Sequence, residues 1–562
     1  MTRTLTIGLA QLDPTVGDLD GNRQLIRAAH AKAAAAGCDL LVCTELVIAG
    51  YPPEDLVLKP IFIDAVEDAV GDLAAETGNG PAILLGAPWR IEGAVHNAAL
   101  LLADGKVAAL TSKHHLPNYG VFDELRVFAP GPLPDPIEFN GVRLGVMVCE
   151  DMWRAGPAEA LKARGAEILI VINGSPFETD KPDERLGLAR DRVAETGLGL
   201  IYVNQVGGQD ELVFDGASFV LGPDGEIRAR LAPFAEDFLH LEFSDSNGRF
   251  DCTPGAIAEG GDGIPAIYKA MVLGLRDYAN KNFFSGVLIG LSGGIDSALS
   301  AVVAVDALGP DRVHCVMMPS PYTSRDSLED AAALAEALGI RLDTVPIDTA
   351  MAAFDGMLKD AFAGHGHDTT EENIQARSRG ITLMALSNKF GYMVLSTGNK
   401  SEMSVGYATL YGDMCGGYSV LKDVYKTTVY ELSRWRNENR PDGMLGPEGA
   451  VIPERIITKA PSAELKPGQK DQDSLPPYEV LDDILRCLIE GDMAIAEIVE
   501  RGHDRDVVMR VWRMVNIAEY KRRQAPPGVK ITRRSFGRDR RYPITNSFTG
   551  ALAAAADDDA AE

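Results

Sequence analysis

The sequence has few features of a membrane, secreted or nucleic-acid-binding protein. It contains no run of about 18 apolar residues, the length needed to span a bilayer. Its seven cysteines are scattered without a CxxC pair, so the sequence predicts neither a disulfide framework nor a zinc site. A net charge of −27 argues against a nucleic-acid or membrane-surface role. Because MTRTLTIGLAQLD also lacks the apolar core of a signal peptide, we expect a cytoplasmic protein.

The chain is long enough for several domains, since about 150 residues is typical of one. Strand-like runs occupy 5–10, 40–43, 82–86, 98–102, 142–149, 168–173, 200–204 and 217–221, and helical periodicity occupies 22–36 and 158–165. This alternation predicts an α/β domain over residues 1–245. A Gly-, Asp- and Ser-rich stretch predicts a linker at 246–264. A second α/β domain is expected over 265–548, followed by an acidic, disordered tail at 549–562.

The segment VLIGLSGGIDSAL, residues 287–299, is the most informative stretch of the chain. An apolar strand runs into a glycine turn, and an Ala/Val/Leu helix follows it. Backbone N–H groups and the positive end of the helix dipole make such a turn an anion site. No Gly-Lys-Ser/Thr sequence closes the turn, so this is not a Walker loop. The run SGGIDS resembles the pyrophosphate-binding loop of the N-type ATP pyrophosphatases, which cleave ATP to AMP and pyrophosphate.

Three residues in the first half have the types needed for amide hydrolysis. Glu45 and Cys149 each follow or end an apolar strand, where α/β folds place reactive groups, and Lys113 lies in TSKHHLPNYGVFDE. A thiolate can attack an amide carbonyl while a carboxylate moves the proton and an ammonium stabilises the oxyanion. A free cysteine, however, more often simply packs in a core.

The motifs GYPPEDL, KHHLPNYGVFDE and CEDMW resemble those of the nitrilase/amidase superfamily over residues 1–245. The resemblance implies an αββα sandwich in which Glu45 is the general base, Lys113 the oxyanion stabiliser and Cys149 the nucleophile that forms a thioester. It makes Glu124 a second, structural glutamate. It further implies a glutamine site that contains Tyr119, Ser175 and Lys181.

The second half carries SGGIDS, ENIQARSRG, TGNKSE, YGDMCGG, DVYKT and KAPSAEL in order, and resembles NAD synthetase over residues 265–525. The implied fold is a doubly wound, Rossmann-like parallel sheet. The implied ATP-binding residues are Ser292, Gly293, Gly294, Asp296, Ser297, Thr397, Lys426 and Ser462. Asn373, Arg377, Glu402 and Lys521 are implied to bind the deamido-dinucleotide, and Asp296 and Glu402 to hold Mg²⁺. In TGNKSE, the Thr, Asn, Lys and Glu are all types that bind phosphate or Mg²⁺.

The whole chain therefore resembles the glutamine-dependent NAD synthetases, which implies an enzyme that uses ATP and glutamine to amidate deamido-NAD. Such an enzyme would supply neutral ammonia from Cys149 to an acyl-adenylate through a protected channel. The family also implies a homo-oligomer, as a dimer of synthetase domains or an octamer. Another glutamine-dependent ATP-pyrophosphatase amidotransferase and a non-catalytic nucleotide-sensing scaffold remain alternatives. The basic residues Arg533, Arg534, Arg538, Arg540 and Arg541 are an interface, a phosphate contact or solvated charge.

Overall fold

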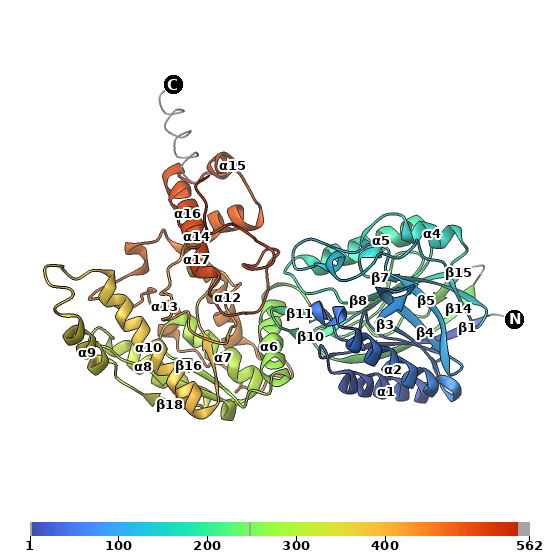
Figure 1. Cartoon of the computed structure of the whole chain (residues 1–562), viewed down its shortest axis with the longest axis horizontal. Coiled ribbons are helices and arrows are strands. Elements are labelled where there is room, and N and C mark those ends of the chain that lie inside the picture. Colours follow the sequence, from blue (N-terminus) through green and yellow to red (C-terminus); the bar gives the residue numbers. More distant parts are fainter. Residues whose placement is uncertain (1–2, 247–248, 549–562) are drawn as a thin grey trace, which may run out of the picture. The chain divides into compact units, whose positions relative to one another are not determined.

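The computed structural model describes residues 3–246 and 249–548 (Figure 1). The described residues divide into two compact units, which meet along the chain between Leu273 and Gly274. This junction lies inside helix α6 (Gly263–Lys281). The expected acidic tail, 549–562, lies outside the described residues. None of the helices that are described is long and apolar enough to cross a membrane.

The first unit contains two mixed β-sheets. One has the strand order β15-β14-β1-β2-β3-β4-β5, and the other has the order β13-β12-β9-β8-β7-β6. The first sheet comprises β1 (Thr4–Gln11), β2 (Leu40–Val42), β3 (Ala82–Ile91), β4 (Ala94–Ala103), β5 (Lys106–Ser112), β14 (Asp237–Ser246) and β15 (Arg249–Cys252). The second comprises β6 (Ile137–Phe139), β7 (Val142–Val148), β8 (Ile168–Asn173), β9 (Leu200–Asn204), β12 (Phe219–Leu221) and β13 (Ile227–Arg230). A separate hairpin joins β10 (Val206–Gln209) to β11 (Leu212–Asp215).

Side-chain alternation makes this unit a four-layer αββα sandwich. In β8, Ile168, Ile170 and Ile172 enter the core between the sheets, whereas Leu169 and Val171 face the covering helices. Helices α1 (Leu19–Ala35) and α2 (Pro60–Glu76) pack on the outer face of the first sheet. Helices α4 (Pro157–Ala163) and α5 (Lys181–Thr196) pack on the second, and the short α3 (Glu150–Trp153) follows β7. The predicted nitrilase-like sandwich is confirmed.

The predicted linker at 246–264 is wrong over much of its length. Strand β15 pairs with β14, with Phe243 opposite Cys252. Phe250 and Cys252 are buried in the core between the sheets. They alternate with polar neighbours, as expected for a half-buried strand. The chain then bonds to β13, where the N–H of Ala258 donates to the carbonyl of Arg230 at 3.0 Å. The Gly- and Asp-rich composition concealed an edge strand.

The second unit is built on an all-parallel sheet with the order β18-β17-β16-β19-β20. Its strands are β16 (Val287–Gly290), β17 (Val313–Met317), β18 (Arg341–Thr344), β19 (Met393–Ser396) and β20 (Tyr418–Ser419). Its first helices are α7 (Ile295–Leu308), α8 (Arg325–Leu338), α9 (Asp348–Leu358), α10 (Thr369–Phe390), α11 (Lys400–Val405) and α12 (Lys426–Glu438). The strand order reverses between β16 and β19, and ligands bind at such a switch point. The doubly wound sheet is confirmed.

Shorter helices complete the second unit. They are α13 (Glu454–Thr458), α14 (Tyr478–Leu485), α15 (Ile495–Glu500), α16 (Arg505–Ile517) and α17 (Glu519–Arg522), with a π-helical turn at Arg486–Glu490. Single 3₁₀ turns occur at Glu54–Leu58, Thr77–Asn79, Glu124–Arg126, Pro310–Arg312 and Asp471–Asp473. Apolar residues of α14 and α16, among them Leu481 and Val511, form one core beside Val405 of α11. The carboxyl-terminal helices therefore support the element that carries TGNKSE.

Candidate active sites

Three strand ends of the first unit bring Glu45, Lys113 and Cys149 together. Glu45 lies just beyond β2, Lys113 directly follows β5, and Cys149 directly follows β7. The first two are fully buried and Cys149 is nearly so. Lys113 Nζ lies 2.8 Å from an oxygen of Glu45 and 2.8 Å from an oxygen of Glu124. One ammonium thus forms ion pairs with two buried carboxylates.

Neutral donors fix the orientation of these two carboxylates. The side-chain amide of Asn97 donates to Glu45 at 2.7 Å, and the backbone N–H of Gly174 donates to its other oxygen, also at 2.7 Å. The hydroxyl of Tyr51 donates to Glu124 at 2.9 Å. Neither residue was identified from the sequence: Asn97 lies in no motif, and Tyr51 lies in GYPPEDL but has no residue type that signals catalysis. Asn97 and Gly174 thus hold Glu45 beside Lys113, and Tyr51 holds Glu124 there.

The surroundings of Cys149 favour the protonated thiol over the thiolate. Burial and the charge of Glu45 raise the pKa of Cys149 well above its ordinary value, although Lys113 opposes the shift. The backbone of Cys149 has φ 44° and ψ −95°, a strained conformation at the start of α3. Burial would lower the pKa of Lys113, but Glu124, Glu45 and Cys149 together raise it well above the usual value. The cluster therefore holds a thiol, an adjacent base and a permanent cation.

Asp151, two residues after the cysteine, ties the Lys113 loop to the Cys149 turn. Its carboxylate accepts the backbone N–H groups of His114 at 3.2 Å and His115 at 2.8 Å. It also accepts the N–H of Val148 at 3.4 Å. Burial raises the pKa of Asp151 to about 6. The motif CEDMW contained this residue, but only the structure shows that it positions the loop.

The three residues predicted to bind glutamine lie around the same cysteine. The hydroxyl of Tyr119 donates to Glu150, the neighbour of Cys149, at 2.8 Å. Lys181 Nζ lies 5.4 Å from the ring centroid of Phe122, which itself packs on Tyr119. Ser175 is buried and follows Gly174, the backbone donor to Glu45. The structure thus gathers these side chains, and their roles stay predictions.

The second unit contains a cavity of about 290 Å³ at the carboxyl ends of β16 and β19. The whole SGGIDS run, from Ser292 to Ser297, lines it. Gly293 has φ +77°, and a Cβ there would lie 2.3 Å from the carbonyl oxygen of Ser327, so the turn requires glycine. The hydroxyls of Ser292 and Ser297 lie 3.0 Å apart and close the turn. Thr397 and Ser462 line the same cavity.

Lys426 connects the two predicted metal ligands. Its ammonium forms an ion pair with Asp296 and lies 3.2 Å from Glu402. The side-chain amide of Asn399 donates to Asp296 at 2.8 Å. Burial, with the charges of Asp296 and Asp471, raises the pKa of Glu402 to about 8. The region therefore has more carboxylate than one lysine neutralises.

This donor set fits an ion carried by a nucleotide. Mg²⁺ prefers oxygen ligands and usually takes one or two carboxylates together with substrate phosphates. Asp296 and Glu402 supply two carboxylates beside the SGGIDS turn. Within residues 3–246 and 249–548, no three His, Cys, Asp or Glu side chains are grouped to hold a metal by themselves. Phosphate oxygens would have to complete the coordination.

Asn373, Arg377 and Lys521 converge on one loop beside the cavity rather than on its wall. The hydroxyl of Thr409 donates to Asn373 at 3.0 Å, and Arg377 Nε donates to the carbonyl of Leu410 at 3.2 Å. Lys521 Nζ donates to the carbonyls of residues 406 and 408 at 2.8 and 2.6 Å. Residues 408 and 412 of this loop also line the cavity. Three of the four predicted dinucleotide residues therefore form one group beside the cavity, whereas Glu402 lines the cavity itself.

Two basic side chains of the cavity wall, Arg379 and Lys459, were not predicted from the sequence. Arg379 lines the cavity, donates from Nε to the carbonyl of Met318 at 3.1 Å, and has a pKa lowered by burial. Lys459, in KAPSAEL, lies 3.1 Å from Glu464 and donates to Ser327 at 2.5 Å. Arg379 lies in ENIQARSRG and Lys459 in KAPSAEL, but basic residues in loops and on helices are ordinarily solvated. The cavity wall thus includes Arg379 and Lys459 besides Lys426.

The arginine cluster is only partly solvated. Arg540 is buried, lies 3.3 Å from Glu519, and stacks 3.6 Å from the ring centroid of Tyr542. Arg534 is half-buried and lies 2.7 Å from Asp492. For Arg540 the alternative of solvated charge is wrong, because its guanidinium stabilises the carboxyl-terminal fold.

Two family models match the chain. The model for NAD synthase matches residues 267–525, and the model for carbon-nitrogen hydrolase matches residues 6–244. A glutamine-dependent NAD(+) synthetase from Rhodobacter capsulatus is 52% identical over 98% of this chain and 99% of that protein. The corresponding protein of Acinetobacter baylyi is 44% identical over 97% of this chain and 99% of that protein.

Solved structures agree with these relatives. A glutamine-dependent NAD+ synthetase from Acinetobacter baumannii, in complex with ADP, has a TM-score of 0.78 and 42% identity, and the match covers 97% of this chain and 99% of that one. A synthetase from Cytophaga hutchinsonii has a TM-score of 0.83 at 22% identity, over 99% and 100% of the chains, which shows a shared fold. With relatives at 52% and 44% identity over almost its whole length, the chain belongs to the glutamine-dependent NAD(+) synthetase family.

Proposed function

We propose that this protein is a glutamine-hydrolysing NAD⁺ synthase, which amidates deamido-NAD with ATP as co-substrate. The observation that carries the proposal is the presence, in one chain, of a buried Glu–Lys–Cys cluster and a glycine-turn cavity with facing carboxylates and cations. Family membership supports it. A nucleotide-sensing scaffold would need neither a base beside a thiol nor a cavity lysine between two carboxylates.

In the first unit, Glu45 acts as general base toward Cys149. The proton moves from the thiol to Glu45 as sulfur attacks the carboxamide carbon of glutamine. Lys113 stabilises the oxyanion of the tetrahedral intermediate. Glu45 then returns the proton to the departing nitrogen, so that ammonia leaves and a thioester remains for hydrolysis. Tyr119, Ser175 and Lys181 are proposed to hold the glutamine.

In the second unit, the SGGIDS turn binds the ATP phosphates through its backbone N–H groups and serine hydroxyls. Thr397, Lys426 and Ser462 are proposed to contact ATP as well. Asp296 and Glu402 would hold Mg²⁺, which spreads phosphate charge when bound. The nicotinate carboxylate attacks the α-phosphorus and pyrophosphate leaves, which gives an acyl-adenylate. Asn373, Arg377 and Lys521, with Glu402, are proposed to hold the dinucleotide.

Ammonia from glutamine completes the reaction by attacking the acyl-adenylate, and AMP leaves. Ammonium cannot attack, and most free ammonia is protonated at neutral pH, so a supply of neutral ammonia from Cys149 removes this obstacle. We propose that this nitrogen reaches the acyl-adenylate before it mixes with solvent. A cytoplasmic location and a homo-oligomer stay predictions.

The acceptor is tested by measuring AMP release with different carboxylate substrates. Purified protein is supplied with ATP, Mg²⁺ and glutamine, and with deamido-NAD, nicotinate mononucleotide or no acceptor. AMP formed in equal amount to NAD⁺, and only with deamido-NAD, is the expected result. Glutamine-dependent AMP release with another acceptor would instead identify a different amidotransferase.

A further inference from the structure

Lys400 is a fully buried lysine of the TGNKSE loop that does not serve the phosphate site expected of it. From this loop, Thr397, Gly398 and Glu402 line the ATP cavity. The ammonium of Lys400 instead lies 2.9 Å from Asp423 and 3.0 Å from Glu490. The expectation that this lysine binds phosphate is therefore wrong, because its contacts are protein oxygens on the other side of α11.

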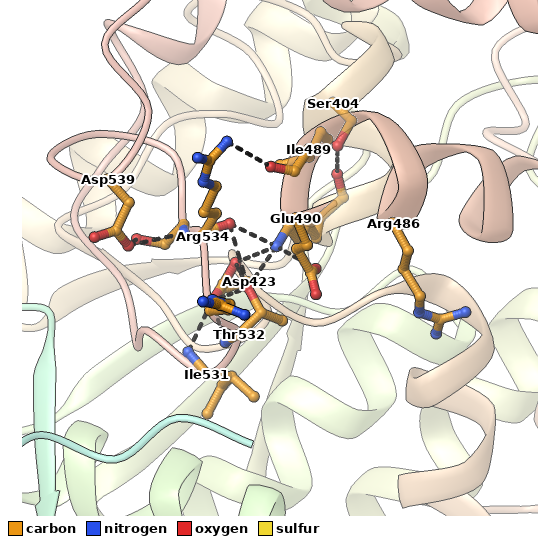
Figure 2. Close-up of polar contacts among 12 residues, drawn as sticks. Ser404, Asp423, Arg486, Ile489, Glu490, Ile531, Thr532, Arg534 and Asp539 are labelled. Carbon is orange, nitrogen blue, oxygen red and sulfur yellow. Dashed lines mark hydrogen bonds and ion pairs between the residues drawn. The ribbon is translucent and has the colours of Figure 1, made fainter. Parts of the chain in front are cut away.

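Lys400 also contacts the carboxyl-terminal segment, residues 527–540. Its Nζ donates to the hydroxyl of Thr532 at 2.5 Å and to the carbonyl of Arg534 at 2.9 Å. Figure 2 shows Asp423, Glu490, Thr532 and Arg534 converging at this point. The ammonium also lies 4.8 Å from the ring centroid of Tyr425. One side chain thus joins α11 to a segment more than a hundred residues away in sequence.

Asp423 holds the same segment by its backbone. Its carboxylate accepts the N–H of Ile531 at 2.8 Å and the N–H of Thr532 at 2.7 Å (Figure 2). Upstream, the N–H of Ser419 in β20 donates to the carbonyl of Pro527 at 2.9 Å. Within the segment, Lys530 lies 3.2 Å from Asp539. The segment is therefore bonded to the sheet edge and to Lys400 along its length.

The opposite side of α11 carries the groups of the ATP site. Asn399 caps the helix by accepting the N–H of Glu402 at 3.0 Å, and it donates to Asp296 at 2.8 Å. Glu402 lies 3.2 Å from Lys426. Because α11 has only six residues, a shift of Lys400 would displace Asn399 and Glu402 together.

We propose that Lys400 is a positioning residue of the synthetase reaction, which locks the segment 527–540 against α11 and thereby sets Asn399 and Glu402 at the ATP site. This inference rests on the proposed function. The proposal gives the carboxyl-terminal segment a part in nucleotide binding, although no residue of this segment that the structure describes lines the cavity. Outer residues that orient ligands in this way typically contribute about 10- to 100-fold to affinity or activity.

The first variant is Lys400→Met, which keeps the length of the side chain and removes its charge. We expect the dissociation constant for MgATP, measured by calorimetry, to rise about 10-fold or more. We expect kcat/KM for ATP with ammonium chloride as nitrogen source to fall by about 10- to 100-fold. Glutamine hydrolysis should keep the wild-type rate, because Cys149 belongs to the other unit.

A double variant separates positioning from stability. Lys400→Met alone leaves the carboxylate of Asp423 buried without its cation, so Lys400→Met/Asp423→Asn is made to remove both charges. We expect the double variant to recover most of the wild-type melting temperature but to keep the weak MgATP binding. Thr532→Val keeps every charge and removes one hydrogen bond of Lys400. If the double variant does not fold, this variant tests the positioning role instead. It should weaken MgATP binding by a smaller factor.

Arg534→Ala is the matched control. Its side chain contacts Asp492 and the carbonyl of Ile489, whereas Lys400 uses only its backbone carbonyl. This variant should bind MgATP as the wild type does. The proposal is overturned if the folded double variant has wild-type MgATP affinity and kcat/KM. If the double variant does not fold, the same result for Thr532→Val overturns it. A loss of MgATP affinity in Arg534→Ala as large as that in Lys400→Met would also overturn it. If wild type makes no NAD⁺ from ammonium, the proposed function fails, while the MgATP affinities still test this inference.

Discussion

The ammonium of Lys113 lies 2.8 Å from the carboxylate of Glu45, and neither side chain is exposed to solvent. A buried pair of this kind is costly to form and costlier to break, because removal of one partner leaves the other charge unpaired. The same ammonium also forms an ion pair with Glu124, at 2.8 Å. If Lys113 acts as proposed, catalysis and stability of the first unit both depend on this one side chain.

Lys113→Met should abolish glutamine hydrolysis and destabilise the first unit. Loss of an oxyanion-stabilising group lowers the rate by about 100- to 1000-fold. Two carboxylates left without their cation should lower the free energy of unfolding by about 3–5 kcal/mol. Glutamate release and denaturant unfolding measure the two effects. Lys106→Met, at an exposed position of the same strand β5, is the control and should change neither. Substantial hydrolysis by a folded Lys113→Met protein would contradict the assigned role.

Asp151 should give the first unit a distinctive dependence on pH. Its pKa, raised to about 6 by burial, exceeds the ordinary 3.8, so the folded state binds the proton more tightly than the unfolded state. The resulting stabilisation is complete below about pH 4 and is lost as pH rises through 6, a change of about 3 kcal/mol.

Asp151→Asn removes this titration. The substitution can also change the free energy of unfolding by an amount that does not depend on pH. The difference in unfolding free energy between Asp151→Asn and wild type should therefore change between pH 4 and 6.5, with the wild type relatively more stable at the acidic end. Asp104→Asn, in the exposed turn after β4, should show no such change. A pH-independent difference for Asp151→Asn would disprove the assignment.

Arg379 should contribute to ATP binding, since its guanidinium lies in the cavity wall. A hydrogen bond to a charged group contributes about 1.5–3 kcal/mol, so Arg379→Met should raise KM for ATP by about 10-fold or more. Arg377→Met, two residues earlier on α10, should instead raise KM for deamido-NAD. Initial rates with each substrate varied in turn distinguish the two. Equal effects of both variants on the two constants would argue against separate roles.

Glutamine nitrogen should enter NAD⁺ without dilution by ammonium in solution. With ¹⁵N-amide glutamine and unlabelled ammonium chloride at a concentration that alone supports only slow synthesis, mass spectrometry of NAD⁺ should show nearly complete labelling. Free mixing of the two nitrogen sources in the product would show that ammonia equilibrates with solvent before it reacts.

Much of the fold follows from local pattern. Continuous apolar runs such as 168–173 became buried strands, and SGGIDS follows a strand and runs into a helix as its composition predicts. Strand β15 was missed because its few apolar residues, Phe250 and Cys252, lie within a Gly- and Asp-rich stretch. Its pairing with β14 is a tertiary contact that composition does not encode.

The site residues also divide into those that local sequence pattern predicts and those that only tertiary contacts reveal. Residues in dense motifs, such as Cys149 and Asp296, are found by sequence because several unusual residue types coincide there. Asn97 lies in no motif, and its partner Glu45 is distant in sequence. Arg379 lies in ENIQARSRG, but its contact with Met318, also distant in sequence, is seen only in the structure. Lys400 illustrates the opposite error, because its motif is right while its side chain faces away from the cavity.

The central claim is that Cys149 supplies nitrogen to a separate ATP-dependent amidation. The direct measurement is NAD⁺ formation from deamido-NAD, ATP and Mg²⁺, with glutamine or ammonium chloride, for wild type and Cys149→Ala. We predict that wild type uses both nitrogen sources, whereas Cys149→Ala uses ammonium at close to the wild-type rate and glutamine not at all. A folded Cys149→Ala protein that still forms NAD⁺ from glutamine, or that has lost the ammonium-supported reaction, would contradict this division of labour.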